Sequence, residues 1–125
     1  MKRLADSELD IMKILWKQDR AMTSNEILDE LKPHRDWKLA SLMAVLARMA
    51  EKGYVSCDRS TRTNYYSAVV GEEEYKTAES SSFMEKLFDN SPTKLVASLY
   101  NGKKLSAKEI KDLRAFLNSL EENGK

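Results

Sequence analysis

The sequence predicts a mostly α-helical chain with one small β-hairpin. Apolar residues recur at helical spacing through most of the 125 residues, and two short β-type runs flank a polar loop near the middle. No apolar run approaches the roughly 20 residues that a membrane span needs. The chain is 42% hydrophobic, which is enough to bury a working core without a disulfide or a metal.

Two helices are expected before residue 33. Leu9, Met12 and Trp16 share one stripe at helical spacing, which predicts the first helix over about 6–16. Three further apolar residues lie beside that stripe, namely Ile11, Ile14 and Leu15. The run Thr23-Ser24-Asn25-Glu26 is a capping box, in which the first hydroxyl and the last carboxylate satisfy free amides at a helix start. The second helix therefore begins there and runs to about Leu31, because Pro33 disfavours helical geometry in the residue before it.

A third helix is expected over 38–52, with Gly53 in the position of a C-terminal glycine cap. Its core stripe has the i, i+3, i+4, i+7 spacing of a buried helix face and consists of Leu39, Leu42, Val45, Leu46 and Met49. The opposite face is small and lightly charged, so another surface could approach it closely; it consists of Ala40, Ser41, Ala44, Ala47, Arg48 and Glu51.

After Gly53 the apolar period changes from helix to strand. Residues 54–57 and 64–68 read as two short strands, and the polar loop between them carries Arg59 and Arg62. Three helices followed by a hairpin with a basic tip is the element order of a winged helix-turn-helix domain. In such domains the later helix of the pair enters the major groove of DNA.

The overall charge of +1 argues, at first sight, against a nucleic-acid partner. Within 32–66, however, seven basic residues face three acidic ones, which gives this stretch a charge of +4. Ordinary surface charge is one explanation. The other is a contact set for double-stranded DNA, with Ser24 donating to a phosphate at a helix start. That set consists of Ser24, Lys38, Ser41, Arg48, Arg59 and Arg62.

From Gly71 onward the pattern is helical again, with helix starts expected near Glu72, at Ser91-Pro92 and at Ser106. Three short amphipathic helices cannot hide their apolar stripes alone, so a second copy of the chain is expected to cover them. We therefore expect a DNA-binding domain over 1–70 and a helical dimerisation domain over 71–125. The expected dimer contacts are Phe83, Leu87, Leu95, Val96, Leu99, Leu113, Phe116 and Leu117.

Other chemistry has little support in the sequence. The only cysteine, Cys57, cannot form an internal disulfide, and no signal peptide is visible, so a cytoplasmic location is expected. Cys57 is interpreted as a small core or strand residue, His34 as a loop residue, and Trp16 and Trp37 as core residues. We expect no metal site, no cofactor and no catalytic activity, because no nucleophile–base pair or glycine-rich phosphate loop is present.

The order and spacing of these motifs resemble the penicillinase repressor family. The resemblance is carried by residues 8–16, the capping box, Trp37, residues 45–49 and 52–54, and residues 65–67, 75–77, 105–110 and 113–114. It implies a dimeric repressor of operator DNA that controls antibiotic resistance or metal homeostasis. In antibiotic-responsive members, a membrane sensor-transducer triggers proteolysis in the dimerisation segment. The matching bond here would be Ser98–Leu99, where the family pattern is Asn followed by Phe.

Two further departures from the family bear on function. The outward face of the third helix carries Ala40, Ser41, Met43 and Ala44, where the family offers longer polar side chains. This predicts either a different operator or a larger share of phosphate contacts. The paired C-terminal cysteines of copper-operon cousins are absent, which excludes a copper response by that route. The alternative function is a winged-helix protein-interaction module without sequence-specific DNA binding.

Overall fold

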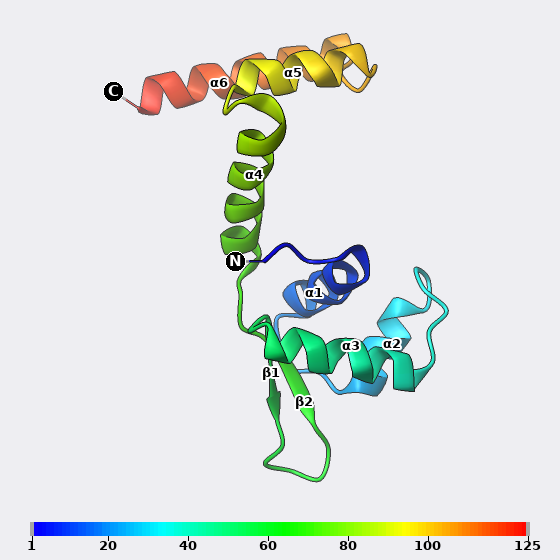
Figure 1. Cartoon of the computed structure of the whole chain (residues 1–125). Coiled ribbons are helices and arrows are strands. Elements are labelled where there is room, and N and C mark those ends of the chain that lie inside the picture. Colours follow the sequence, from blue (N-terminus) through cyan, green and yellow to red (C-terminus); the bar gives the residue numbers. More distant parts are fainter. Residues whose placement is uncertain (1, 125) are drawn as a thin grey trace. The chain divides into compact units, whose positions relative to one another are not determined.

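The computed structural model describes residues 2–124 and confirms the fold class (Figure 1). The chain forms helices and one antiparallel hairpin in the predicted order, and two compact units divide within the fourth helix, after Glu79. The predicted boundary at 70/71 separates a DNA-binding from a dimerisation domain, and that assignment of functions stays a prediction. The elements are α1 Asp6–Gln18, α2 Ser24–Leu31, α3 Leu39–Glu51, β1 Val55–Asp58, β2 Tyr65–Ala68, α4 Glu72–Phe88, α5 Pro92–Asn101 and α6 Ala107–Asn123.

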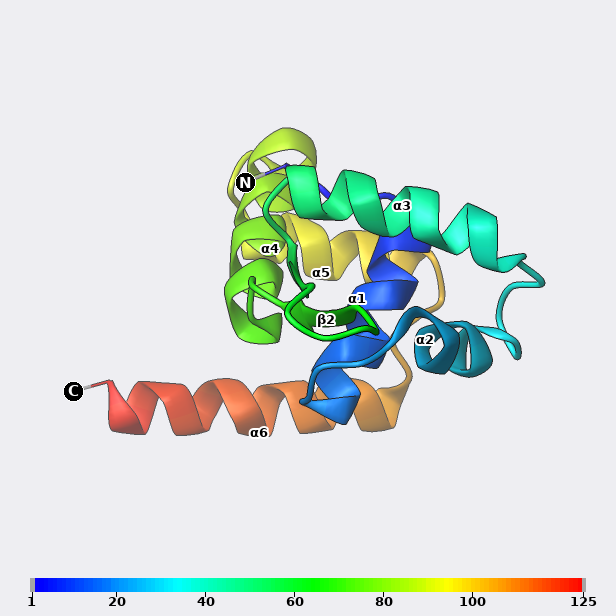
Figure 2. The same cartoon turned by 90° about the horizontal axis from the view of Figure 1, so that it is seen from below.

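The core of the first unit lies between the first three helices and the hairpin. Helix α1 packs on α2, α2 packs on α3, and the hairpin closes the core against α3 and α1 (Figure 2). The predicted stripe residues Leu9, Trp16 and Leu39 are half-buried. The fully buried side chains of the helices are Ile11 and Met12 of α1, Ile27 and Leu31 of α2, and Leu42, Leu46 and Met49 of α3, and outside the helices Met22 and Tyr54 are also fully buried. Trp16 and Trp37 pack against this core as partly buried residues, as predicted.

Each strand begins one residue later than the sequence predicts, β1 at Val55 and β2 at Tyr65. Tyr54 lies between α3 and β1 and bonds to both sides, since its amide caps the end of α3 and its carbonyl accepts from the Val69 amide at 2.8 Å. The Tyr54 amide donates to the Met49 carbonyl at 3.0 Å, and the Gly53 amide donates to that of Ala50 at 3.1 Å. Gly53 has a φ of +84°, the left-handed geometry predicted for a glycine cap. A third segment pairs with the hairpin, since Met22 and Tyr66 exchange backbone hydrogen bonds of 2.9 and 2.7 Å.

A buried carboxylate ties the start of α1 to the end of α3. The Glu8 side chain is only 4% exposed, and its two oxygens accept from Lys52 Nζ at 2.8 and 3.1 Å. It also accepts from the Ala5 amide at 2.8 Å, which satisfies a free donor at the start of α1. Burial acts to raise the pKa of Glu8. The hydrogen bonds from Lys52 and Ala5, with the nearby charge of Arg48, outweigh it and hold this pKa below the ordinary value.

The first turns of α4 complete the core of the first unit. Tyr75 is 5% exposed, and its hydroxyl accepts a 2.9 Å hydrogen bond from the Leu4 amide. Its ring lies 6.1 Å from both the Trp16 and the Tyr54 rings. The Trp16 indole in turn donates to the Val70 carbonyl at 2.9 Å. The segment after the hairpin is therefore bound to α1 through Val70, and the start of α4 is bound to the N-terminal segment through Tyr75.

The second unit comprises the rest of α4 with α5 and α6. The predicted caps are present: the hydroxyl of Ser91 accepts from the Lys94 amide at 3.2 Å, and that of Ser106 accepts from Glu109 at 3.1 Å. Within 80–124 no side chain is fully buried, so the helices of this unit have no closed core of their own. No helix in the described part of the chain is long and apolar enough to cross a membrane.

Replacing Lys52 tests whether its ion pair with Glu8 stabilises the attachment of α3 to α1. We expect Lys52→Met to lower the free energy of unfolding by about 3 kcal/mol at neutral pH, because it strands a buried carboxylate. The matched control is Lys32→Met, since Lys32 pairs with Asp29 on the open surface and its loss should cost less than about 1 kcal/mol. Chemical denaturation of both variants measures the difference, and equal losses would contradict the assignment.

The same pair predicts a pH dependence. Because the folded pKa of Glu8 lies below its unfolded value, the stabilisation is fully present above the unfolded value of about 4.3 and is lost as the pH falls through the folded pKa. In the Lys52→Met variant, the Glu8 carboxylate loses its cationic partner and takes up a proton at a higher pH than in the wild type. Because burial without Lys52 raises the pKa of Glu8 in the variant, the stability gap between wild type and variant should narrow as the pH falls through and below the unfolded value of about 4.3. Denaturation curves at several pH values check this. A gap that is constant with pH would show that the charge of Glu8 is not involved.

Candidate nucleic-acid interface

The start of α2 is fixed by the predicted capping box. The Thr23 hydroxyl accepts from the Glu26 amide at 3.1 Å, and the Glu26 carboxylate accepts from the Thr23 amide at 2.9 Å. The bond from the Thr23 amide, with a further contribution from Arg20, lowers the pKa of Glu26. Ser24, the first residue of α2, is half-buried. Its amide lies in the first turn, where a helix offers donors to an anion.

The connection between α2 and α3 is held from both sides. Arg35 Nε donates to the Asp10 carboxylate on α1 at 2.7 Å, and the Arg35 guanidinium lies 5.7 Å from the centre of the Trp37 ring. Trp37 itself packs on the core. Lys38 follows Trp37 and is the exposed residue directly before the start of α3. The segment that leads into α3 is thus fixed to α1 through Arg35 and to the core through Trp37.

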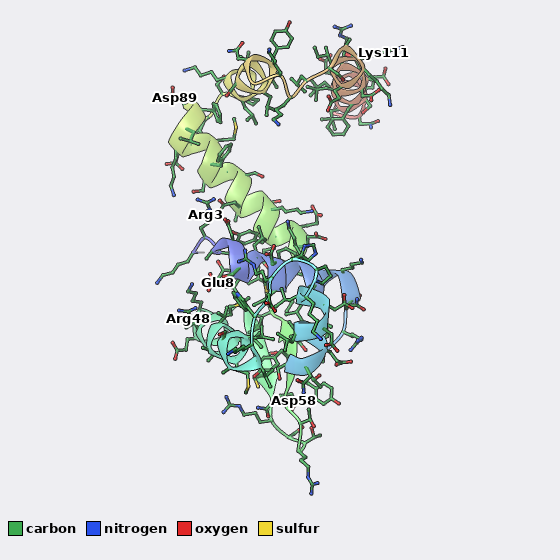
Figure 3. All side chains as sticks on the ribbon, turned by 90° about the vertical axis from the view of Figure 1, so that its right-hand side faces the viewer. Arg3, Glu8, Arg48, Asp58, Asp89 and Lys111 are labelled. Carbon is green, nitrogen blue, oxygen red and sulfur yellow. The ribbon has the colours of Figure 1, made fainter. Side chains whose placement is uncertain are left out.

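The outward face of α3 is exposed and carries few polar groups. Every residue predicted for this face is solvent-exposed, and so is Met43 at 43%. Ser41 lies in the first turn and Arg48 in the last turn of the helix. Arg48, labelled with Glu8 in Figure 3, lies near enough to that buried carboxylate for its charge to help lower the pKa of Glu8. The face is therefore flanked by Lys38 at one end and by Arg48 at the other.

The loop between β1 and β2 presents the other two predicted bases. Residues 59–63 are exposed, among them Arg59 and Arg62, and Figure 1 shows the hairpin extending away from α3. The loop is shaped by Asp58, whose carboxylate accepts from the Ser60 amide at 2.9 Å. Hydrogen bonds from the Ser60 side chain and backbone lower the pKa of Asp58. Because the Thr61 hydroxyl also donates to the Thr63 carbonyl at 2.7 Å, the tip is internally bonded.

Two basic residues near this face are absent from the predicted contact set. Lys2 and Lys52 line a surface hollow of about 680 Å³ together with Arg48 and Glu51. Lys52 follows Arg48 by one helical turn, which is a signal that the sequence contains. Lys2 comes from the far N-terminal segment, and no local pattern predicts its position. The six predicted contact residues all lie on the first unit, at the start of α2, along α3 and in the hairpin loop.

The predicted dimer residues lie on the second unit with their apolar side chains uncovered in the single chain. Leu95, Val96 and Leu113 are half-buried. The others are between 39% and 64% exposed, namely Phe83, Leu87, Leu99, Phe116 and Leu117. Tyr100, at 61%, and Leu120, at 48%, are further exposed apolar residues of the second unit that were not in the predicted set. Ser98 and Leu99 lie inside α5 and are exposed.

The remaining chemistry-bearing residues lie apart from one another. His34 is exposed in the connection that follows α2, and Cys57 is half-buried in β1. Between residues 2 and 124, no group of three or more His, Cys, Asp or Glu side chains could hold a metal ion.

Known proteins are similar to this chain over almost its whole length. The family model described as penicillinase repressor matches residues 4–119. The penicillinase repressor of Bacillus licheniformis is 26% identical over 92% of this chain and 89% of its own length. The methicillin resistance regulatory protein MecI of Mammaliicoccus sciuri is 27% identical over 92% of this chain and 93% of its own.

Two solved structures are similar to the first unit. One is the DNA-binding domain of the repressor BlaI, at 28% identity and a TM-score of 0.51, which covers 60% of this chain and 94% of its own. The other is monomeric Bacillus licheniformis BlaI in complex with the blaP half-operator, at 27% identity and a TM-score of 0.50, covering 59% and 89%. Motif order, fold and family model agree, and the chain belongs to the penicillinase repressor family.

Proposed function

We propose that this protein is a dimeric transcriptional repressor that binds double-stranded operator DNA through α2, α3 and the hairpin loop. The observation that carries the proposal is the exposed outward face of α3, with exposed arginines on the adjoining loop. The chain is also similar, over 59% of its length, to monomeric BlaI solved in complex with a half-operator. Its site of action is the cytoplasm, and the operon it controls serves resistance or a stress response.

The basic side chains supply the sequence-independent part of the binding. Lys38 and Arg48 flank the helix face that would enter the major groove, and Arg59 and Arg62 would reach the backbone or the adjacent minor groove. The Ser24 amide and hydroxyl would donate to a phosphate at the start of α2. Ser41 is the predicted contact in the first turn of α3 that can hydrogen-bond a base edge.

The second unit supports pairing with a second copy of the chain. Its helices are capped and amphipathic, yet no side chain within 80–124 is fully buried. Apolar stripes of this kind are stabilised by packing against a partner. A symmetric dimer would also bring two copies of α3 to two half-sites of an operator.

Relief of repression by cleavage at Ser98–Leu99 is the finer part of the proposal, with a membrane sensor-transducer as the partner that triggers it. The bond lies in the last turn of α5, and the Ser98 carbonyl accepts from the Gly102 amide at 3.0 Å. Cleavage there requires this turn to open, because proteolysis proceeds from locally unfolded chain. Ser98–Leu99 also differs from the family pattern of Asn followed by Phe.

The wing arginines give the first test. We expect Arg59→Ala and Arg62→Ala each to weaken binding to the upstream DNA of the protein's own gene roughly tenfold, as for one lost charge-assisted hydrogen bond. Each should also reduce the salt slope of binding by about one. Arg114→Ala, on exposed α6, is the matched control and should change neither quantity. Titrations at several salt concentrations measure both.

The outcomes of that titration separate two classes of protein. No binding of the wild type even at low salt would favour a protein-interaction module, since the alanine-rich face of α3 could pack on protein instead. Binding that is equally strong in all three variants would leave DNA binding in place and remove the hairpin loop from the interface.

The dimer is tested by sedimentation at micromolar concentration. The wild type should sediment as a dimer, and Phe116→Asp should raise its dissociation constant roughly thirtyfold, because it places a charge in the apolar surface. Asn118→Asp, at an exposed position on the same helix that is not part of the predicted set, changes the charge by the same amount and is the control for the added negative charge. A wild-type monomer would contradict the proposal.

A further inference from the structure

We propose that α3 of this chain selects thymine through apolar contact with its 5-methyl group, and that Met43 is the side chain that carries this selectivity. The inference rests on the proposed function, because it concerns which base edges the outward face of α3 would read. It assigns to this face a specificity that Lys38 and Arg48 at its ends do not provide.

Met43 stands out within the first unit. Its side chain is 43% exposed in the middle of α3, and it is the only large hydrophobic residue of α1, α2 or α3 with that degree of exposure in the described chain. The other apolar residues of α3 longer than alanine are buried or half-buried in the core. A single exposed apolar side chain is common on protein surfaces. Met43, however, lies on the face proposed to meet DNA, where its side chain is free to contact a base edge.

Hydrogen-bonding capacity is scarce over the same face. Between Lys38 and Arg48, Ser41 is the only exposed residue whose side chain has a donor or acceptor. Bidentate recognition of guanine or adenine requires Arg, Lys, Asn or Gln. Ser41 can make at most a single-atom contact to a base, so the middle of the face has no means of bidentate recognition.

Apolar contact is the chemistry that remains. The 5-methyl of thymine is the only apolar group that the base edges offer in the major groove. The alanines on either side of Met43, Ala40 and Ala47, are short enough to let the helix approach the bases closely. The unbranched thioether chain of methionine adapts to irregular apolar surfaces. Met43 can therefore cover a thymine methyl, and cytosine or uracil at that position would leave the contact empty.

The test begins with the tightest duplex that the wild type recovers from a random-sequence library. Each thymine of that duplex is then replaced, one at a time, by deoxyuridine, which removes the methyl and keeps the base pairing. We expect binding to weaken roughly threefold at each contacted thymine, from the apolar area lost, with the salt slope unchanged because no phosphate contact is removed. Deoxyuridine outside the protected segment should have no effect.

Two variants assign the effect to a side chain. Met43→Ala should abolish the loss at the thymine that Met43 covers, so that this duplex and its deoxyuridine version bind the variant equally well. Val69→Ala, which shortens an apolar side chain that is 59% exposed and lies outside α3, should keep the full loss. Circular dichroism of both variants should match the wild type, since neither side chain is buried.

The outcomes are distinguishable. If the wild type binds the duplex with the expected salt dependence but no deoxyuridine replacement weakens it, thymine selection is overturned and the proposed repressor function stands. If replacements weaken binding equally in wild type and Met43→Ala, the role of Met43 is overturned. If no duplex is bound at low salt, the proposed function fails and this inference fails with it.

Discussion

The arrangement of the first unit depends on one buried carboxylate. Glu8 lies on α1 with almost no solvent exposure, so its charge must be compensated within the protein. Lys52, just beyond α3, and the Ala5 amide, just before α1, provide that compensation. The end of α3 is thereby held to the start of α1, and the turn before α3 is held to α1 through Arg35 and Asp10. Because α3 is held at both ends and buries its apolar stripe in the core, its opposite face remains exposed to solvent.

Local patterns were sufficient to predict the elements. The helical spacing of apolar residues located the helices, and the boxes at Thr23 and Ser106 located two starts. Gly53 located the end of α3 because its left-handed geometry favours glycine. These features are predictable because each depends on residues within one or two turns. The first strand begins at Val55 rather than Tyr54 because the Tyr54 amide bonds back to the end of α3, which the strand-like pattern does not reveal.

Contacts between distant segments were not predictable from a single sequence. Glu8 reads as one more charged residue of an amphipathic helix, and nothing near it indicates a partner 44 positions away. Tyr75 reads as an apolar residue of a C-terminal helix, although it completes the N-terminal core. For the candidate interface, the exposure of the arginines followed from their polar loop. The hollow that joins Lys2 to Arg48 arises only from tertiary packing.

The bond between the Leu4 amide and the Tyr75 hydroxyl spans 71 positions of the sequence and has a consequence for biosynthesis. A ribosome releases the chain from its N-terminus, and domains fold as units as they emerge. The first unit cannot close its core when β2 leaves the exit tunnel, because Tyr75 and the Val70 carbonyl have yet to follow. By then much of α4 must be synthesised as well. The nascent chain can therefore complete its first unit only once Tyr75, in the first turns of α4, has left the tunnel.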